Sequence, residues 1–363
     1  MPIKIKPVPL MFLLVWLATW QSVNAAVIED LYDAKIAVND QSQRSQNTAF
    51  SLALKQVLIK VRGNKDLLAN QKIKSALTKA TRFVRSYSYE KIESQLYLVI
   101  SFDPQRVENI IRNSGFPVWD KRRPDSLIWL AIKSSEDSAR QIATLSEFSD
   151  IYQQMSVRAA QRGITLMFPL WDLDDVQTLG VYDIWGGFIS QISMASERYA
   201  VPSILSARLY PTDDLTQSSG LVAPLWSADW TMIERGGLLA GQVQGETPMA
   251  IAEALIDSLA DQLSLKYAID LAQVDRADSR VQIIINNIDS LNYYSLALSS
   301  LENMSVVDDV TLIKQQGSRA TFELDLLGDV EDLTNALNLD NKIRPVVDDF
   351  GQPILGLEFF WVK

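Results

Sequence analysis

The spacing of apolar residues in the first third of the chain predicts a small unit in which helices pack on a sheet. Residues 43–62 carry apolar side chains at the three- and four-residue intervals of one helix face, and Gly63 is placed to end this helix. Strand-like runs follow at residues 82–89 and 96–102, and Asp103-Pro104 is typical of a helix start. We therefore expect an α+β domain over residues 26–120.

The middle of the chain alternates short apolar runs with long amphipathic stretches, which is typical of an α/β layered domain. Long helices are expected over residues 138–162 and 184–199, and Thr247-Pro248 begins a third. Short apolar strands lie between the helices, so a mixed sheet is expected within residues 126–270. Residues 115–125 contain two prolines and the basic run Lys121–Arg123, and are expected to form the linker before this domain.

The last part of the chain has the order β-α-β-β-α-β, which predicts a ferredoxin-like α+β domain over residues 279–363. Asp289 and Asp329 are expected to cap its helices. The last strand is expected either at residues 342–347 or at residues 354–362.

The start of the chain has the pattern of a cleavable signal peptide. Lys4 and Lys6 precede the apolar run Leu10–Trp20, and Val23-Asn24-Ala25 offers small residues for cleavage after Ala25. The apolar run is about half of the ~20 residues that a membrane-spanning helix needs, although an uncleaved anchor is the alternative. We therefore expect a periplasmic protein with no transmembrane segment after cleavage of residues 1–25.

The chain has no cysteine and no histidine. This composition excludes disulfides, thiol chemistry and catalysis by a Ser-His-Asp or Cys-His arrangement, and a typical zinc site is not expected. Carboxylate acid/base chemistry, a hard cation on oxygen ligands, or a Ser-Lys pair are left open. No nucleotide-binding motif occurs, and we expect no cofactor and assign no catalytic residue or metal ligand.

Charge is unevenly distributed along the chain, whose net charge is −10. Residues 26–124 have 17 basic and 10 acidic side chains, a balance of +7, whereas residues 125–363 have 15 basic and 34 acidic ones, a balance of −19. Such an asymmetry is typical of separate domains with separate surfaces, and the two parts can also attract each other.

Basic residues concentrate between Lys55 and Lys91, where ten of them stand against Asp66 and Glu90. This pattern predicts a docking surface for an envelope protein or an anionic envelope polymer, whereas nucleic acid is not expected in the periplasm. A solvated helix face that also contacts the acidic remainder of the chain is the alternative. The candidate docking residues are Lys72, Lys74, Lys79, Arg82 and Arg85.

A second candidate site follows the apolar run at residues 164–168, because ligands gather beyond the carboxyl ends of strands in open α/β sheets. Closely spaced carboxylates there suit a small ligand or a hard cation, although a turn and helix cap is the favoured explanation. With tryptophans as sugar platforms, the same carboxylates suit a glycan-processing enzyme, while a filled core is the other interpretation of the tryptophans. The candidate residues are Asp172, Asp174, Asp175, Asp183, Trp185, Gly186 and Gly187.

Four segments together resemble a family of secreted bacterial proteins, the domain-of-unknown-function family 2066. They read AFSLALKQVLIKVRGNKDLL from Ala49, RGITLMFPLWDLDD from Arg162, WGGFISQISMASERY from Trp185 and WSADW from Trp226. The resemblance extends over nearly the whole chain after the signal peptide and implies no catalytic residue. The outer domains are also loosely similar to small α+β modules of periplasmic assembly proteins.

The sequence therefore favours a periplasmic, non-catalytic binding or adaptor protein in envelope assembly or maintenance. The alternatives are a carboxylate-dependent enzyme of cell-wall or glycan processing, and a binder of a small ligand or cation at the central acidic loop.

Overall fold

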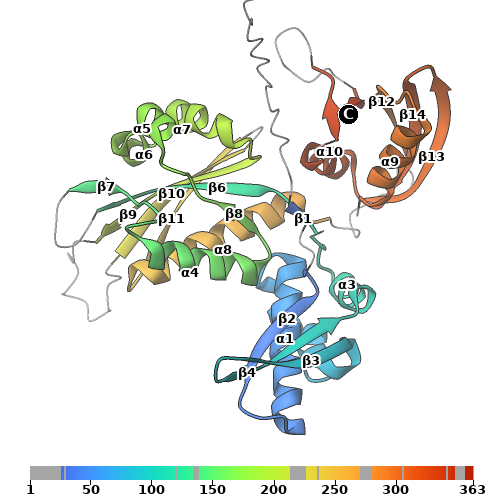
Figure 1. Ribbon diagram of the computed structural model, residues 1–363. Coiled ribbons are helices and arrows are strands. Elements are labelled where there is room, and N and C mark those ends of the chain that lie inside the picture. Colours follow the sequence, from blue (N-terminus) through green and yellow to red (C-terminus); the bar gives the residue numbers. More distant parts are fainter. Residues whose placement is uncertain are drawn as a thin grey trace, which may run out of the picture.

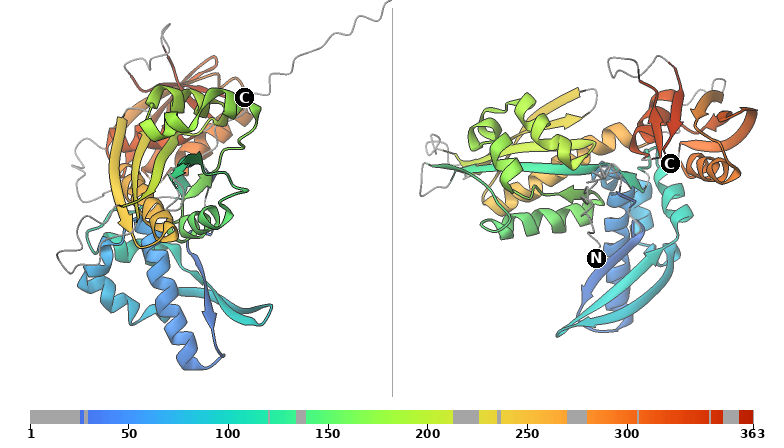
Figure 2. Two further views of the ribbon diagram at one scale, coloured as in Figure 1. Left: turned by 90° about the vertical axis from the view of Figure 1, so that its left-hand side faces the viewer. Right: turned by 45° about the horizontal axis from the view of Figure 1, so that its top comes forward.

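The computed structural model describes residues 26–27, 30–119, 121–133, 139–212, 226–234, 237–269, 280–304, 306–340, 342–347 and 356–362. The predicted signal peptide, residues 1–25, lies outside these residues. Three units, each with its own buried core, lie around a common junction near the start of the described chain (Figures 1 and 2). The predicted α/β and α+β fold class is confirmed. Among the described helices, none combines the length and the apolar character needed to cross a membrane.

The N-terminal unit packs one long helix, α1, against a three-stranded antiparallel sheet of order β2-β4-β3. Ser42 caps the start of α1, and Gly63 ends it in a left-handed conformation (φ 79°), as the sequence predicts. Asp103 caps α3 with Pro104 as its first residue, also as predicted. The elements are β2 (Asp33–Val38), α1 (Gln43–Arg62), η1 (Asp66–Ala69), α2 (Gln71–Leu77), η2 (Ala80–Phe83), β3 (Val84–Ile92), β4 (Gln95–Phe102) and α3 (Pro104–Arg112).

The central unit is a mixed sheet of order β11-β10-β9-β6-β7, with β8 also paired to β6, between two layers of helices. Figure 1 shows α4 and α8 on one face of the sheet and α5, α6 and α7 on the other. The elements are β6 (Asp125–Lys133), β7 (Arg140–Ile142), α4 (Ser149–Arg162), β8 (Thr165–Met167), α5 (Leu173–Thr178), α6 (Val181–Gly186), α7 (Ile189–Ser196), η3 (Glu197–Tyr199), β9 (Ser203–Pro211), β10 (Trp226–Glu234), β11 (Gly237–Gly245) and α8 (Pro248–Tyr267).

The C-terminal unit has the expected order of strands and helices through its second helix, and then adds a strand. The two candidate segments for the last strand both form strands, and β16 lies parallel to β12 between β12 and β15. The sheet order is β13-β14-β12-β16-β15, so a strand is inserted where a ferredoxin-like sheet would end. The elements are β12 (Arg280–Asn286), α9 (Leu291–Glu302), β13 (Val307–Gln316), β14 (Arg319–Leu326), α10 (Val330–Leu339), β15 (Ile343–Pro345) and β16 (Glu358–Trp361).

Three local predictions are wrong, and local hydrogen bonding or glycine explains two of them. The helix expected from residue 138 begins at Ser149, because Thr144 and Ser146 join a side-chain hydrogen-bonded turn just before it. The helix expected over residues 184–199 is divided into α6, α7 and η3, because Gly187 adopts a left-handed conformation (φ 68°). The cap of α9 is Ser290 rather than Asp289.

The predicted linker connects the N-terminal and central units, and part of residues 115–125 is buried at the junction of the units. Trp119 is fully buried, and its backbone N–H donates to the carbonyl of Val61 (2.8 Å). Val118 exchanges two backbone hydrogen bonds with Ile269 (3.1 and 2.9 Å). Arg122 and Arg123 form β5, which pairs with β1 (Ala26–Val27). This segment therefore connects the units by packing rather than by a flexible tether.

Arg123 is a fully buried guanidinium that holds the N-terminal and central units together. Its Nη1 donates to the carbonyls of Arg162 (3.1 Å) and Gly163 (2.6 Å), and its Nη2 to those of Lys60 (2.6 Å) and Trp119 (3.2 Å). The guanidinium carbon lies 4.0 Å from the centre of the Trp119 ring. A buried charge costs several kcal/mol unless it is solvated by the protein, and carbonyls from both units provide that solvation here.

An ion-pair network lies beside Arg123 and connects the same two units. Asp257 on α8 accepts from Arg158 and Arg162 of α4 (2.6 Å each) and from Lys65 of the N-terminal unit (2.5 Å). Arg162 also pairs with Asp261 and donates to the carbonyl of Gly63 (2.7 Å). Burial raises the pKa of Asp257, but the hydrogen bonds from Arg158, Lys65 and Arg162 outweigh it and hold that pKa well below its usual value.

Arg122 provides the corresponding connection to the C-terminal unit. Its guanidinium donates to the carbonyl of Ser300 (3.0 Å) and pairs with Asp340 (3.4 Å), whose side chain also accepts from the Ser300 hydroxyl. Two neighbouring arginines in one short strand therefore connect the three units.

Replacing Gly63 with alanine tests the contact between the units. Gly63 and Gly115 share a positive φ (79° and 80°), but a Cβ on Gly63 would overlap Ser264 of α8 and Trp119, whereas one on Gly115 would meet nothing within 4 Å. We expect Gly63→Ala to lower the free energy of unfolding by about 3 kcal/mol and Gly115→Ala by about 1 kcal/mol. Urea unfolding measures both, and equal losses would contradict the close approach of α8 to Gly63.

Asp257→Asn is expected to lower the free energy of unfolding by about 2–4 kcal/mol at neutral pH, because it leaves buried arginine charge without its carboxylate. The folded-state pKa of Asp257 is lowered from 3.8, so the stabilisation is full above about pH 5 and is lost as pH falls through 3.8 toward the folded-state pKa. Denaturant unfolding across this range should show the difference between variant and parent shrinking with acid. Glu90→Gln, in an exposed pair with Lys35, is the control and should cost less than 1 kcal/mol at every pH.

Candidate functional site

The acidic loop that the sequence offers as a candidate site forms the N-terminal cap of α5. Asp172 accepts a hydrogen bond from the backbone N–H of Asp175 (3.2 Å) at the start of α5. The Asp175 carboxylate is buried and accepts from the backbone N–H of Trp171 (2.8 Å) and from the Tyr199 hydroxyl (2.5 Å). Burial and the bond to Asp175 raise the pKa of Tyr199 to about 12, so this phenol keeps its proton. Both carboxylates therefore have structural partners within their own helix layer.

Arg198 forms ion pairs with the carboxylates of the acidic loop. Its two terminal nitrogens donate to the two oxygens of Asp172 (2.6 and 2.7 Å), and Nη1 also reaches Asp175 (3.1 Å). The hydrogen bonds from Arg198 lower the pKa of Asp172 to about 2, which is opposite to the raised pKa that a general acid needs. Asp174 lies 3.9 Å from the same guanidinium and is exposed. No group of carboxylates that could hold a metal ion occurs among the described residues.

The other residues predicted for this site are used in the turns between the short helices. Asp183 accepts from the backbone N–H of Gly180 (2.7 Å) and so caps α6. Trp185 packs against the sheet, with Arg140 4.8 Å and Arg208 5.9 Å from its ring centre. Gly186 lies against the Phe188 ring, and Gly187 supplies the left-handed residue that ends α6. The structure brings Asp172, Asp174 and Asp175 together around Arg198, but it gives the others separate roles.

The tryptophans of the β10 strand face the core. Trp230 is buried, and its ring lies so close to Gly241 on the neighbouring strand that a Cβ there would overlap it. Trp226 is partly buried against the same core cluster. These two side chains therefore fill the space under α8, which matches the core interpretation of the sequence pattern rather than an exposed sugar platform.

The basic candidates of the N-terminal unit, by contrast, surround an open groove of about 710 Å³ between α2, η2 and α3. Its apolar floor includes Ala76, Phe83 and Ile110. Its four cations come from α2, η2, α3 and the turn between α2 and η2. The described lining contains no carboxylate. The lining consists of Gln71, Lys72, Ser75, Ala76, Lys79, Arg82, Phe83, Arg106, Asn109, Ile110 and Asn113.

The cations of this groove differ in how they are held. Lys72 donates to the backbone carbonyl of Asn113 (2.6 Å), and Arg106 donates to the carbonyl of Arg82 (2.5 Å) while lying 3.5 Å from Asp103. The side chains of Lys79 and Arg82 are exposed, and neither has an ion-pair partner within the described part of the chain. Two cations are thus fixed by backbone carbonyls, and two are available to an anionic ligand.

Three of the five predicted docking residues, Lys72, Lys79 and Arg82, line this groove, whereas Lys74 and Arg85 are exposed outside it. Sequence reasoning missed Arg106. It shares one face of α3 with Asn109, Ile110 and Asn113, and this spacing of three, four and seven residues was the signal that could have identified it.

Other basic residues of the same stretch are structural. Lys60 is buried and donates to the carbonyls of Asp30 (3.3 Å) and Asp33 (3.0 Å), and burial lowers its pKa. Arg62 pairs with Asp66, and Lys65 with Asp257. Lys65 of the basic stretch therefore contacts the acidic remainder of the chain. Such a contact was part of the alternative interpretation of the basic stretch.

A comparison with protein families corrects the expected resemblance. Residues 25–120 match a family model described as a domain of unknown function (DUF8605). This is a different family from family 2066, and its match covers the N-terminal unit rather than nearly the whole chain. A search of curated proteins found no match.

Arg198→Met tests the structural role of the acidic loop. Without the guanidinium, the pKa of Asp172 should rise from about 2 toward 3.8, because its main hydrogen-bond donor is gone. Titration of the side-chain carboxyl carbon by NMR measures this shift. Arg140→Met removes a cation that lies over Trp185 instead and should leave the pKa of Asp172 unchanged. An unchanged Asp172 pKa in the Arg198 variant would show that this arginine does not hold the loop.

Proposed function

We propose that this protein is a non-catalytic binding protein of the bacterial envelope that docks an acidic segment of a partner protein in the groove between α2 and α3. The observation that carries this proposal is the combination of four cations with an apolar floor and no lining carboxylate among the described residues.

The apolar floor favours a protein segment over a charged polymer. A polyanion needs cations alone, and an exposed helix face would provide them without a hollow. Here Ala76, Phe83 and Ile110 lie between the cations, so an occupant gains by burying apolar side chains as well as by pairing charge. An acidic amphipathic helix has both properties, and helices that lie in apolar grooves are a recurring mode of peptide recognition.

Two further observations support the proposal. Every residue that lines the groove lies within residues 25–120, the segment matched by the family model, so the docking surface belongs to the part of the chain shared with other proteins. The signal-peptide pattern of residues 1–25 supports export to the periplasm, where an assembly or maintenance partner would be met.

The chemistry of the central unit gives less support to the enzyme alternative. Arg198 pairs with Asp172 and Asp175 of its acidic loop, and the Asp172 pKa of about 2 suits a permanently ionised cap. A glycosidase of the usual kind needs one carboxyl with a raised pKa facing a second carboxylate across the substrate.

Charge reversal of groove residues tests the docking site. Lys79→Glu and Arg82→Glu should each weaken binding of a fluorescein-labelled acidic amphipathic helical peptide about tenfold or more, because an attractive contact becomes repulsive. Fluorescence anisotropy at two salt concentrations measures the affinity.

Lys74→Glu and Arg85→Glu are matched controls, because they make the same change of charge at exposed positions outside the groove. They should change the affinity by less than about threefold. Equal losses in all four variants would contradict a groove and indicate diffuse attraction, which is the behaviour expected for an anionic polymer. Binding that is insensitive to every reversal would reject the surface altogether.

A further inference from the structure

One edge of the N-terminal sheet is open beside α1 (Figure 1). The strand at this edge, β2, pairs with β4 on one side only. The Phe102 N–H donates to the carbonyl of Tyr32 (3.0 Å), the residue before β2, and the backbone groups of successive residues in a strand face alternate sides. The N–H and C=O groups of Ile36 therefore pair with β4, whereas those of Lys35 and Ala37 face the open edge.

The backbone of this edge is available to another strand. None of the four backbone groups of Lys35 and Ala37 hydrogen-bonds to any described residue. Asp33, at the start of the strand, differs because its carbonyl accepts from the Lys60 ammonium group (3.0 Å). Unpaired edge groups are a template for pairing with another chain. Lys35 and Ala37 thus offer two donors and two acceptors to an added strand.

A groove follows this open edge between β2 and α1, and we call it the β2 groove. It consists of two hollows of about 590 and 250 Å³, which share Ile36, Ala37 and Leu52 in their linings. The α1 wall presents Leu52, which is 49% exposed, and the partly buried Ile59. An extended segment in this groove would bury apolar side chains on α1 while its backbone pairs with β2, which is a recurring mode of peptide recognition.

The β2 groove is lined by one sign of charge. Its described lining has no carboxylate, and its six basic residues are Lys35, Arg44, Lys55, Lys65, Arg158 and Arg162. Four of them pair with carboxylates outside the lining, whereas the exposed Arg44 and Lys55 form no ion pair with any described residue. The groove therefore favours an acidic occupant. A second copy of β2 would bring like charges together instead.

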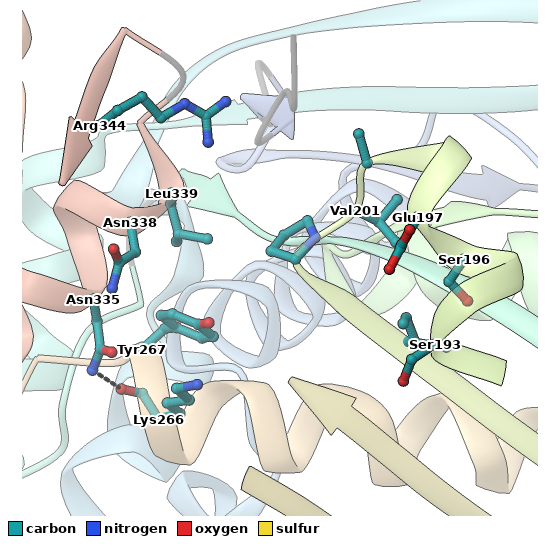
Figure 3. A pocket seen from close by; sticks show the side chains of 13 residues that line it. Ser193, Ser196, Glu197, Val201, Lys266, Tyr267, Asn335, Asn338, Leu339 and Arg344 are labelled. Carbon is teal, nitrogen blue, oxygen red and sulfur yellow. Dashed lines mark hydrogen bonds between the residues drawn. The ribbon is translucent and has the colours of Figure 1, made fainter. Parts of the chain in front are cut away.

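The cavity between the central and C-terminal units lacks this combination (Figure 3). Its volume is about 350 Å³, and Glu197 stands among its lining residues. Lys266 pairs with Glu234 (3.2 Å), and Asn335 donates to the backbone carbonyl of Lys266 (3.4 Å), which joins α10 to the end of α8. Its lining carries both signs of charge, so it does not select an acidic partner as the β2 groove does.

From these observations we infer that β2 accepts an extended, acidic segment of a partner protein as an additional strand. The backbone of the segment pairs with Lys35 and Ala37. Its apolar side chains pack on Leu52 and Ile59, and its carboxylates are attracted by Lys55 and the other cations of the groove. The β2 groove shares no residue with the groove between α2 and α3, and it recognises a strand rather than a helix.

Two N-methylated peptides test the added strand without any change to the protein. The parent is a fluorescein-labelled peptide of six residues in which glutamate and valine alternate, and fluorescence anisotropy measures its affinity. One isomer is N-methylated at its glutamates and the other at its valines, so each loses the backbone donors on one side only. One isomer should bind about tenfold or more weakly than the parent, and the other within about threefold of it. Equal binding of the two isomers, or no saturable binding of the parent, would overturn the inference.

Two variants assign the site to β2 and α1. Ala37→Pro removes a donor that faces the open edge and keeps the ladder to β4, so it should weaken parent binding about tenfold, whereas Ala37→Val keeps the donor and should stay within about threefold. Lys55→Glu should weaken binding about fivefold or more, while Lys74→Glu, exposed outside both grooves, should change it less than about twofold. Equal effects of a variant and its control would contradict the site.

Two further measurements separate this site from its alternatives. Ala37→Pro should leave binding of the acidic helical peptide unchanged, and Lys79→Glu should leave binding of the strand peptide unchanged, so either groove can fail without the other. The first result also shows that the proline variant is folded. Sedimentation velocity of the protein alone should show a monomer. A dimer that Ala37→Pro dissociates would show that a second copy occupies the edge, and would overturn the inference.

Discussion

The arrangement of the protein depends on two buried arginines at the junction of its units. Arg123 is surrounded by backbone carbonyls of both the N-terminal and the central unit, and Arg162 reaches Gly63 on one side and two carboxylates of α8 on the other. Desolvation of two guanidinium groups is costly, so these contacts stabilise one arrangement of the units and make any other arrangement expensive. Gly63 and Gly163 contribute by allowing close approach without a side chain.

The proposed docking groove lies apart from this junction. Lys65 pairs with Asp257 at the junction, and Lys60 and Arg62 are bound by groups of their own unit, so these three cations are separate from those that line the groove between α2, η2 and α3. On the other side, the neighbouring Arg122 fixes the C-terminal unit through Asp340 and so defines the cavity between α10 and α8. Arg122 and Arg123 thus fix the positions of the three units relative to one another.

Elements with strong local signals were predictable from the sequence. The caps Asp103-Pro104 and Thr247-Pro248 and the stop at Gly63 are decided within a few residues, and the structure has them as expected. The linker was located by its prolines and charges, but its burial could not be predicted, because the burial of Trp119 and Arg123 depends on carbonyls far away in sequence. The acidic loop was ambiguous for the same reason, because Arg198, which pairs with Asp172 and Asp175, is 23–26 residues away. The cations of the groove were predictable in part. Charge density identified Lys72, Lys79 and Arg82, whereas Arg106 lies beside them only because α3 packs against this part of the unit.

Photo-crosslinking in cells tests the central claim, docking at the groove, most directly. A photoreactive amino acid is placed at one of two positions. Lys79 lines the groove, and Lys74 lies nearby on α2 but outside the groove. Our account predicts that position 79 captures one dominant protein through an acidic segment identified by mass spectrometry, and that Arg82→Glu abolishes this adduct. Identical adducts from both positions, or no protein adduct from position 79 in cells that express the exported protein, would contradict it.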